Sequence, residues 1–388
     1  MKEIYLDNAA TTQMYIGVYD AMRPYLLDDY HNPSAIYKST FKIREAIEHA
    51  REQIAKAVNC DPDLVFFTSG GTEADNWIIR EFLTSHIYTS TIEHKAVLEA
   101  CHKREKETYT QVTYIPVDMN GAIHLGKLDS ELAKAPKRPL VSIMTANNEI
   151  GTIQPLRTIG KLAYEADGFF HTDAVQAIGT VPIDMQKMGI NFLSMSAHKF
   201  HGPKGIGALC CNVEARDVPI PFIVGGSQQF NMRAGTENVP AIVGMGKAIE
   251  LTMRNMDERN TNIGRLRDYL QDLIISDVPE VIVNGGYEPY SDHPKRLPNN
   301  LNVSFKGIDG QQLLAMLDNR GISVSAGSAC NAEDVRPSHV LTAIKVPKEY
   351  INGTIRFSLS EYTTKDDIVY TAMVVTESVK ALREMHNA

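Results

Sequence analysis

The sequence lacks the features that assign a chain to a membrane, to an oxidising compartment or to nucleic acid. No apolar run approaches the length of a membrane span, and residues 1–7 contain no apolar core of a signal peptide. The five cysteines are irregularly spaced without a Cys-x-x-Cys pair, which favours neither a disulfide framework nor a zinc site. With 47 acidic against 39 basic side chains, the net charge of −8 disfavours general nucleic-acid binding. We therefore expect a cytoplasmic protein that binds neither membrane nor nucleic acid directly.

Internal repeats, low-complexity tracts and coiled-coil heptads are also missing from the sequence. Hydrophobic residues make up 43% of the chain and charged residues 22%, as is typical of globular proteins. Because 388 residues exceed the size at which a single hydrophobic core stops growing, we expect one large and one smaller domain. Four of the cysteines are expected to be small buried residues: Cys60, Cys101, Cys210 and Cys211.

Short apolar segments alternate with longer amphipathic stretches between residues 64 and 210. Seven of these segments are predicted strands: 64–68, 86–90, 112–116, 140–146, 169–172, 192–196 and 206–210. Helical spacing of apolar residues predicts helices over 41–58 and 260–275, the second of which would begin the second domain. Strands that alternate with helices indicate crossover units, so the predicted fold is α/β with a mostly parallel sheet.

The C-terminal part of the chain shows a different pattern. Residues 279–298 are rich in Gly, Pro, Asn and Asp and predict loops around a short strand. After them the sequence predicts a strand (300–305), a helix (310–317), a loop (325–337), a strand (354–358) and a helix (365–385). This order indicates a smaller α+β domain.

Lys199 is the most informative residue of the chain. It follows the predicted strand 192–196 and precedes a glycine-rich turn, which places an amine at the carboxyl edge of the sheet, where ligands bind in open α/β folds. Desolvation and cationic neighbours there would favour the neutral amine, which can form a Schiff base with a carbonyl such as that of pyridoxal phosphate (PLP). A solvated surface lysine is the general alternative. Ser196 and His198 argue against it, because they flank Lys199 with donors suited to a phosphate.

The run Ser69-Gly70-Gly71-Thr72 is a second chemical signal, because it follows the predicted strand 64–68 and opens a helix. Glycines let the backbone approach a phosphate, and a helix N-terminus offers unpaired N–H groups. Gly71 and Thr72 are the expected direct contacts. A plain strand-to-helix turn would explain only the glycines.

Asp173 and Gln176 follow the predicted strand 169–172. PLP needs a carboxylate at its pyridine nitrogen so that the ring stays protonated and withdraws electrons, and Asp173 suits that role. Gln176 is suited to a hydrogen bond with the phenolic oxygen of the cofactor. For Asp173 on its own, a helix-capping aspartate is the alternative.

In their order and spacing, these segments resemble the class V aminotransferase-like enzymes of PLP fold type I, and among them the NifS/IscS cysteine desulfurases. The matching segments are 5–12, 32–34, 67–76, 92–94, 147–151, 171–176, 194–207, 233–238, 327–330 and 355–358. The resemblance covers nearly the whole chain and implies a large domain with a seven-stranded sheet. It also implies an N-terminal arm (1–14) that contributes to the small domain, a large PLP-binding domain (15–257), and a small C-terminal domain (258–388) with the catalytic cysteine loop.

The resemblance further implies roles for individual residues. His94 would stack on the cofactor ring and shuttle protons, and Asn148 would contact both cofactor and substrate. Arg356 would clamp the substrate carboxylate together with Asn148, because arginine offers a bidentate fork. Thr236 would reach a phosphate across a dimer interface, so the resemblance implies an obligate homodimer with a shared active site.

Cys330 lies in a small, polar segment similar to the loop of the group I desulfurases. A thiolate there would be delivered to the sulfur atom of a bound substrate. The sequence departs from the family at residues 331–334, where Asn-Ala-Glu-Asp replaces a Thr/Ser-rich stretch, and at His31, where glycine is common. Glu333 and Asp334 would disfavour the thiolate, which affects the speed of persulfide formation and not the chemistry.

The predicted function is therefore a PLP-dependent cysteine desulfurase that converts L-cysteine into L-alanine and leaves a persulfide on Cys330. The sulfur would pass to an acceptor protein, a scaffold or a thiolation enzyme, for iron–sulfur clusters, thiolated tRNA or another cofactor. One alternative is a selenocysteine lyase or another class V activity such as transamination. A second is a non-catalytic sulfur-relay or scaffold protein, against which the presence of Lys199 and Asp173 argues.

Overall fold

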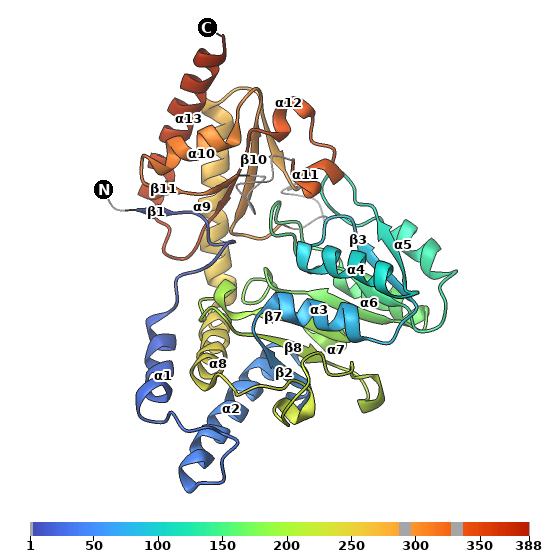
Figure 1. Ribbon diagram of the computed structural model, residues 1–388. Coiled ribbons are helices and arrows are strands. Elements are labelled where there is room, and N and C mark those ends of the chain that lie inside the picture. Colours follow the sequence, from blue (N-terminus) through green and yellow to red (C-terminus); the bar gives the residue numbers. More distant parts are fainter. Residues whose placement is uncertain (1–2, 287–295, 327–336, 388) are drawn as a thin grey trace.

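Two β-sheets of different size organise the protein (Figure 1). The computed structural model describes residues 3–286, 296–326 and 337–387. The larger sheet has the strand order β2-β8-β7-β6-β5-β3-β4. Its strands are β2 Val65–Thr68, β3 His86–Ser90, β4 Gln111–Ile115, β5 Leu140–Ser142, β6 Phe169–Asp173, β7 Phe192–Ser196 and β8 Gly207–Cys211. All neighbours pair in parallel except β8, which is antiparallel to both β7 and β2. This confirms the predicted α/β fold with a mostly parallel sheet of seven strands.

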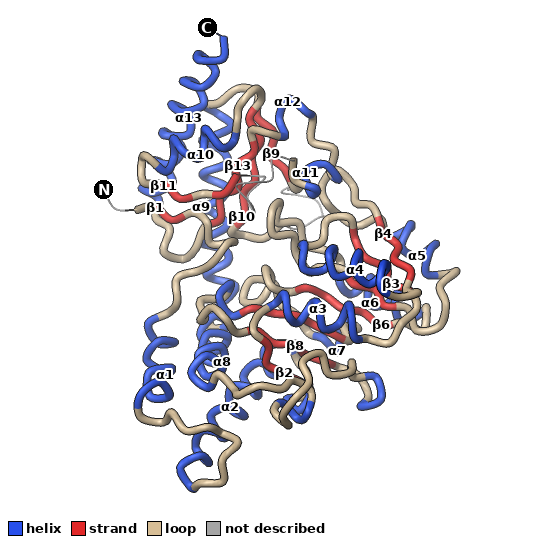
Figure 2. The backbone as a smooth tube through the Cα atoms, in the orientation of Figure 1, coloured by secondary structure: helices blue, strands red, loops and turns tan. Residues whose placement is uncertain are grey.

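Helices cover both faces of the larger sheet (Figure 2). They are α1 Ile16–Leu27, α2 Phe41–Val58, α3 Gly71–Glu81, α4 Lys95–Glu107, α5 Leu125–Leu132, α6 Leu156–Glu165, α7 Met185–Met188 and α8 Val239–Met253. Trp77 of α3 shares a hydrophobic cluster with Phe192, whereas Ile54 of α2 shares another with Leu193. Because successive residues of β7 point to opposite faces, both faces are covered and the whole strand is buried. In the described part of the chain, no helix has the length and apolarity needed to cross a membrane.

The smaller sheet is antiparallel, with the order β12-β13-β10-β9. Its strands are β9 Val281–Asn284, β10 Asn300–Phe305, β12 Ser325–Ala326 and β13 Thr354–Ser358. The accompanying helices are α9 Met256–Asp277, α10 Gly310–Asp318, α11 His339–Ala343, α12 Lys348–Ile351 and α13 Lys365–Asn387. Near the N-terminus, β1 (Ile4–Tyr5) pairs in parallel with β11 (Ile322–Ser323). The second sheet has its own hydrophobic cluster. The domain boundaries at residues 14 and 257 stay a prediction.

Several predicted elements have the observed bounds, and the differences have physical reasons. The elements that match are 41–58, 86–90, 192–196, 300–305 and 354–358. The predicted strand 140–146 ends at Ser142, because Met144 N donates to the Glu93 carboxylate (2.9 Å to Oε2) and not to a neighbouring strand. Helix α9 begins at Met256 and not at residue 260. Two acidic residues in its first turn stabilise this earlier start.

The predicted loop 325–337 and the buried cysteines need correction. Ser325–Ala326 form β12 on the edge of the smaller sheet, and residues 327–336 lie outside the described residues. Cys101, Cys210 and Cys211 are buried as expected, but Cys60 is only partly buried. It follows the left-handed C-cap residue of α2, Asn59, where the chain leaves the helix.

Candidate active site

A cavity of about 670 Å³ opens between the carboxyl ends of the parallel strands and the smaller sheet. Every predicted site residue in the described part of the chain lines this cavity, with the exception of Thr236. These residues are Gly71, Thr72, His94, Asn148, Asp173, Gln176, Ser196, His198, Lys199 and Arg356. This is the location expected for a ligand site in an open α/β fold.

Lys199 reaches the cavity from a short turn after β7. The strand ends at Ser196, and a 3-10 turn (Ala197–Lys199) follows, in which Phe200 N donates to Ala197 O (3.0 Å). The half-buried Lys199 donates through Nζ to the carbonyl oxygens of Ala9 (2.5 Å) and Ala10 (2.8 Å). The N-terminal segment therefore orients the amine at the edge of the cavity.

Asp173 is the last residue of β6 and is buried at the cavity. Val175 N donates to its Oδ1 (2.9 Å). Burial raises the pKa of Asp173, while the nearby His94 and Lys199 act in the opposite direction. A cationic ring against this carboxylate would offset the free-energy cost of burying its charge. The position therefore fits a protonated pyridine nitrogen.

Two histidines near Lys199 are partly buried, which favours their uncharged form. His94 caps α4, and its Nδ1 accepts a hydrogen bond from Ala96 N (3.1 Å), which leaves the ring proton on Nε2. Burial lowers the pKa of His94. Burial and then Lys199 lower the pKa of His198 to about 4, and its Nδ1 lies 3.2 Å from Thr11 Oγ1. An uncharged imidazole at residue 94 can stack on an aromatic ring or exchange a proton.

The N-terminus of α3 borders the cavity, and its backbone at Gly71 lies close to the side chain of Val175. A Cβ at Gly71 would lie 2.5 Å from Val175 Cγ2, so a larger residue there would force Val175 to move. The Glu73 carboxylate accepts a hydrogen bond from Ser69 N (2.8 Å) and pairs with Arg233 (Nε to Oε1, 2.9 Å), which holds the turn in place. The first-turn N–H groups and the helix dipole suit a phosphate at Gly71 and Thr72.

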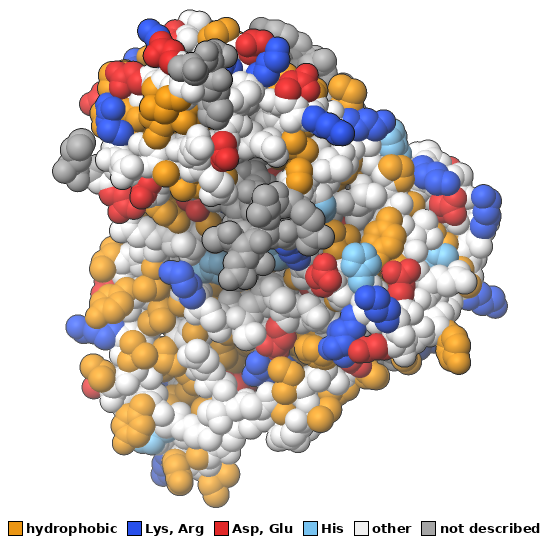
Figure 3. All heavy atoms as spheres, turned by 45° about the horizontal axis from the view of Figure 1, so that its top comes forward, with side chains coloured by type: hydrophobic (Ala, Val, Ile, Leu, Met, Phe, Trp, Pro, Cys, Tyr) orange, Lys and Arg blue, Asp and Glu red, His pale blue; other side chains and the backbone are white. Residues whose placement is uncertain are grey.

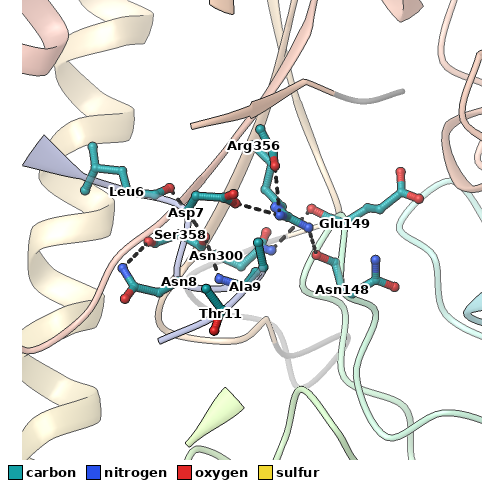
Figure 4. A network of polar contacts seen from close by, with 12 residues as sticks. Leu6, Asp7, Asn8, Ala9, Thr11, Asn148, Glu149, Asn300, Arg356 and Ser358 are labelled. Atoms are coloured by element: carbon teal, nitrogen blue, oxygen red, sulfur yellow. Dashed lines mark hydrogen bonds and ion pairs between the residues drawn. The ribbon is translucent and has the colours of Figure 1, made fainter. Parts of the chain in front are cut away.

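Arg356 on β13 lines the cavity from the smaller sheet, and Figure 4 shows its guanidinium between Asp7 and Asn148. Its Nη1 donates to the main-chain oxygen of Asn148 (2.9 Å), and its Nη2 donates to Asp7 Oδ1 (2.8 Å) and Ser325 Oγ (3.1 Å). Arg356 and Asn148 are thus in contact through the main chain of Asn148, and their predicted joint clamp on a substrate carboxylate stays a prediction. A guanidinium held from several sides can bind a carboxylate in one orientation.

Comparison with known proteins agrees with this geometry. Residues 4–370 match the family model of the class V aminotransferases. The chain belongs to this family. Within it, the cysteine desulfurase IscS of Dictyoglomus turgidum is 47% identical over 388 residues, which cover 98% of this chain and 96% of that protein. A solved NifS-like protein has a TM-score of 0.88 at 34% identity and covers 98% of this chain and 100% of its own. The structure of SspA in complex with cysteine has a TM-score of 0.79 at 34% identity, with coverage of 93% and 100%.

These similarities confirm the predicted resemblance, but two predicted site residues are not among the described residues that line the cavity. Thr236 is exposed and does not line it, although Arg233 of the same segment pairs with α3. Cys330 lies outside the described residues. The described residues nearest to it in the chain, Ala326 and Pro337, both line the cavity. The roles of Thr236 and Cys330 stay predictions.

The sequence analysis missed a buried acid in this class V site. Asp75 of α3 lines the cavity at 1% exposure, and its Oδ1 has no hydrogen-bond partner among the described residues. It lies 3.7 Å from Nε2 of His171, which is neutral because burial lowers the pKa of His171 to about 3. Burial also raises the pKa of Asp75. A signal was present, because a helix that begins at Gly71 places residue 75 on the same face one turn later.

Glu93, next to His94, is a second missed acid. Ser90 Oγ lies 2.5 Å from its Oε1, and Met144 N donates to both carboxyl oxygens. Burial raises the pKa of Glu93 to about 8, although these hydrogen bonds act in the opposite direction. Burial therefore favours the protonated form of Glu93 in the folded protein at neutral pH.

This protonation predicts a pH-dependent stability. The unfolded chain ionises Glu93 near pH 4.5 and the folded protein near pH 8, so folded-state stability falls as pH rises between these values. The variant Glu93→Gln cannot ionise at this position and should not lose stability in this way. As pH rises, the free energy of unfolding of the variant should therefore rise relative to that of the wild type, by up to about 1.4 kcal/mol per pH unit. Urea denaturation of the apoprotein between about pH 5 and pH 7 measures the difference. The exposed Glu45→Gln on α2 is the control. A difference that does not change with pH would contradict this expectation.

Proposed function

We propose that this chain is a PLP-dependent cysteine desulfurase that converts L-cysteine into L-alanine and passes the sulfur atom to Cys330. The observation that carries the proposal is that Lys199, Asp173 and Arg356 line one cavity, which is bordered by Ala326 and Pro337 on either side of the cysteine segment. The similarity to cysteine desulfurases over 98% of the chain supports the same activity.

The cavity residues fit PLP. The buried carboxylate of Asp173 suits the ring nitrogen, and the N–H groups of the first turn of α3, which begins at Gly71, suit the phosphate. The residues that would hold the cofactor are Gly71, Thr72, His94, Asn148, Asp173, Gln176, Ser196, His198 and Lys199, with Thr236 from a partner subunit. When bound, PLP supplies an aldehyde carbon for attachment and a ring that withdraws electrons from the substrate Cα.

Four groups of the chain would act on the substrate or the cofactor ring before sulfur moves. Arg356 would bind the α-carboxylate and so orient the substrate Cα. The Lys199 amine would take the proton from Cα, as a positioned general base. The Asp173 carboxylate would keep a proton on the ring nitrogen throughout. The neutral His94 would exclude water from the ring face that it covers.

Sulfur transfer needs the Cys330 thiolate. It attacks the substrate Sγ, so that a sulfur–sulfur bond forms and the substrate Cβ–Sγ bond breaks. The electron pair of the broken bond stays on Cβ, which takes up a proton and becomes the methyl group of alanine, and Lys199 would return a proton to Cα. Cys330 is left as a persulfide, whose outer sulfur would pass to an acceptor protein.

The proposal includes a homodimer in which Thr236 serves the site of the partner subunit. Exposed hydrophobic side chains gather on the side of the molecule that holds α1 and the segment leading into α2 (Figure 3). They are Ile16, Tyr19, Leu26, Leu27, Tyr30, Ile36, Tyr37 and Phe41. A second copy of the chain would remove this patch from water. The cytoplasmic location stays a prediction from the sequence.

The purified protein incubated with L-cysteine in the absence of reductant tests the proposed function. We expect alanine to form, and mass spectrometry to find one additional sulfur atom on the peptide that contains Cys330. A requirement for an added keto acid would instead indicate transamination. A strong preference for selenocysteine over cysteine would indicate a selenocysteine lyase. Alanine formation without any protein persulfide would contradict the proposal.

A further inference from the structure

The N-terminal segment that carries Asp7 is tied to the strand that carries Arg356. Asp7 forms an isolated parallel bridge with Ser358 at the end of β13. Ser358 N donates to Leu6 O (2.7 Å), and Asn8 N donates back to Ser358 O (3.2 Å). Ala9 N donates to Ser358 Oγ (2.8 Å). The backbone on both sides of Asp7 is therefore fixed relative to Arg356, two residues before Ser358.

Side chains lock the same segment. The Asn8 side chain donates to Ser358 O (2.8 Å). The Tyr5 hydroxyl lies within hydrogen-bond distance of two carbonyl oxygens, those of Asp7 (3.0 Å) and Thr11 (2.9 Å). The backbone that carries Asp7 is consequently ordered already. Little further conformational entropy is therefore lost when the Asp7 carboxylate binds the Arg356 guanidinium.

Asp7 and Arg356 form an ion pair at the edge of the cavity (Figure 4). The distance from Arg356 Nη2 to Asp7 Oδ1 is 2.8 Å, and the two side chains are only 11% and 18% exposed. Among the described residues, this is the one carboxylate within ion-pair distance of Arg356. Such a charge-assisted hydrogen bond fixes the orientation of a planar guanidinium more strongly than hydrogen bonds to neutral oxygens do.

A second carboxylate lies close enough to compete for Arg356. Glu149 is partly buried; desolvation raises its pKa, while Ser338, His339 and Arg356 act in the opposite direction. Its Oε2 accepts a hydrogen bond from Ser338 Oγ (2.5 Å). If Asp7 were absent, the guanidinium would be drawn toward Glu149 and away from its present orientation.

We propose that Asp7 is a positioning residue of the substrate site, whose carboxylate holds the Arg356 guanidinium in the orientation that receives the α-carboxylate of the amino acid. This inference rests on the proposed function, because it takes the ligand of Arg356 to be an amino acid. It adds to that function a role for the N-terminal arm. Binding of the substrate carboxylate depends on a residue 349 positions away in the sequence from the arginine.

Asp7→Ala tests the inference through the split between KM and kcat. Loss of a charge-assisted contact that orients substrate binding should raise KM for L-cysteine about tenfold and leave kcat within about threefold of the wild type. Asp7→Asn keeps an acceptor at the same place and should recover part of the loss. Glu3→Gln is the matched control, because Glu3 lies in the same arm, is exposed, and bonds to Ser323 instead of Arg356.

A second readout uses the apoprotein and does not depend on activity. In protein labelled with ¹⁵N-arginine, the Nε–H signal of Arg356, assigned with Arg356→Lys, should shift in Asp7→Ala and stay in place in Glu3→Gln. An unchanged KM and an unmoved signal in Asp7→Ala would overturn the inference, as would a fall in melting temperature with equal losses in kcat and kcat/KM. If the wild type forms no alanine, the proposed function fails, and the Nε–H signal still decides whether Asp7 positions Arg356.

Discussion

The Cys330→Ser variant is expected to bind PLP and L-cysteine normally and yet release almost no alanine or sulfide. In the proposed mechanism, substrate binding and removal of the Cα proton use Arg356 and Lys199 and need no protein thiol. Sulfur transfer needs a nucleophile, and a serine hydroxyl is far too weakly acidic to replace a thiolate. We expect the rate of alanine formation to fall by about a thousandfold or more, while L-cysteine still changes the cofactor absorbance.

The other cysteines are poor substitutes for Cys330. Burial raises the pKa of Cys101 to about 12. The pKa of Cys210 is raised first by its hydrogen bond with Cys60 and then by burial, and the pKa of Cys211 is raised by burial. Cys60 is partly buried and therefore provides the matched control, since Cys60→Ser should keep wild-type alanine formation. Alanine formation by Cys330→Ser at the wild-type rate would show that Cys330 is not the nucleophile.

Asp173→Ala is expected to lose most of its activity at an earlier step. The variant removes the charge that would keep the ring nitrogen protonated, and one lost charge-assisted contact is worth about 1.5–3 kcal/mol or more. A fall of about tenfold to a hundredfold or more in Cα proton removal follows, because each 1.4 kcal/mol changes a rate about tenfold. Solvent deuterium exchange at Cα, measured by mass spectrometry of recovered substrate, reports this step directly.

The cause of the Asp173 effect can be separated from packing. Asp173→Asn keeps the volume of the side chain and removes its charge, so it should lose nearly as much activity as Asp173→Ala. Borohydride reduction should fix the cofactor to Lys199 in the wild type and in both variants, which shows that the site is still loaded. Near-wild-type exchange with a normal cofactor spectrum in Asp173→Ala would refute the assigned role.

Local sequence determined many elements of the fold and much of the candidate site. The strand 192–196 is apolar throughout because both of its faces are buried, and α2 shows helical periodicity because one face packs on the sheet. Lys199 and Asp173 directly follow or end such strands, so their approach to one sheet edge follows from the parallel topology. The glycine at residue 71 likewise indicates a position without room for a side chain, since a Cβ there would meet Val175.

Tertiary structure alone decided the interactions that depend on packing between distant segments. The strand β5 ends early because the Glu93 carboxylate, 51 positions away, takes the N–H of Met144. Asp75 and Glu93 look like ordinary helical and loop acids in the sequence, and only burial raises their pKa. The pairing of Asp7 with Arg356 requires the N-terminal arm to lie along β13. Hydrophobic periodicity specifies which residues are buried. The partner of a buried polar side chain depends instead on which segments, distant in sequence, come into contact in the folded protein.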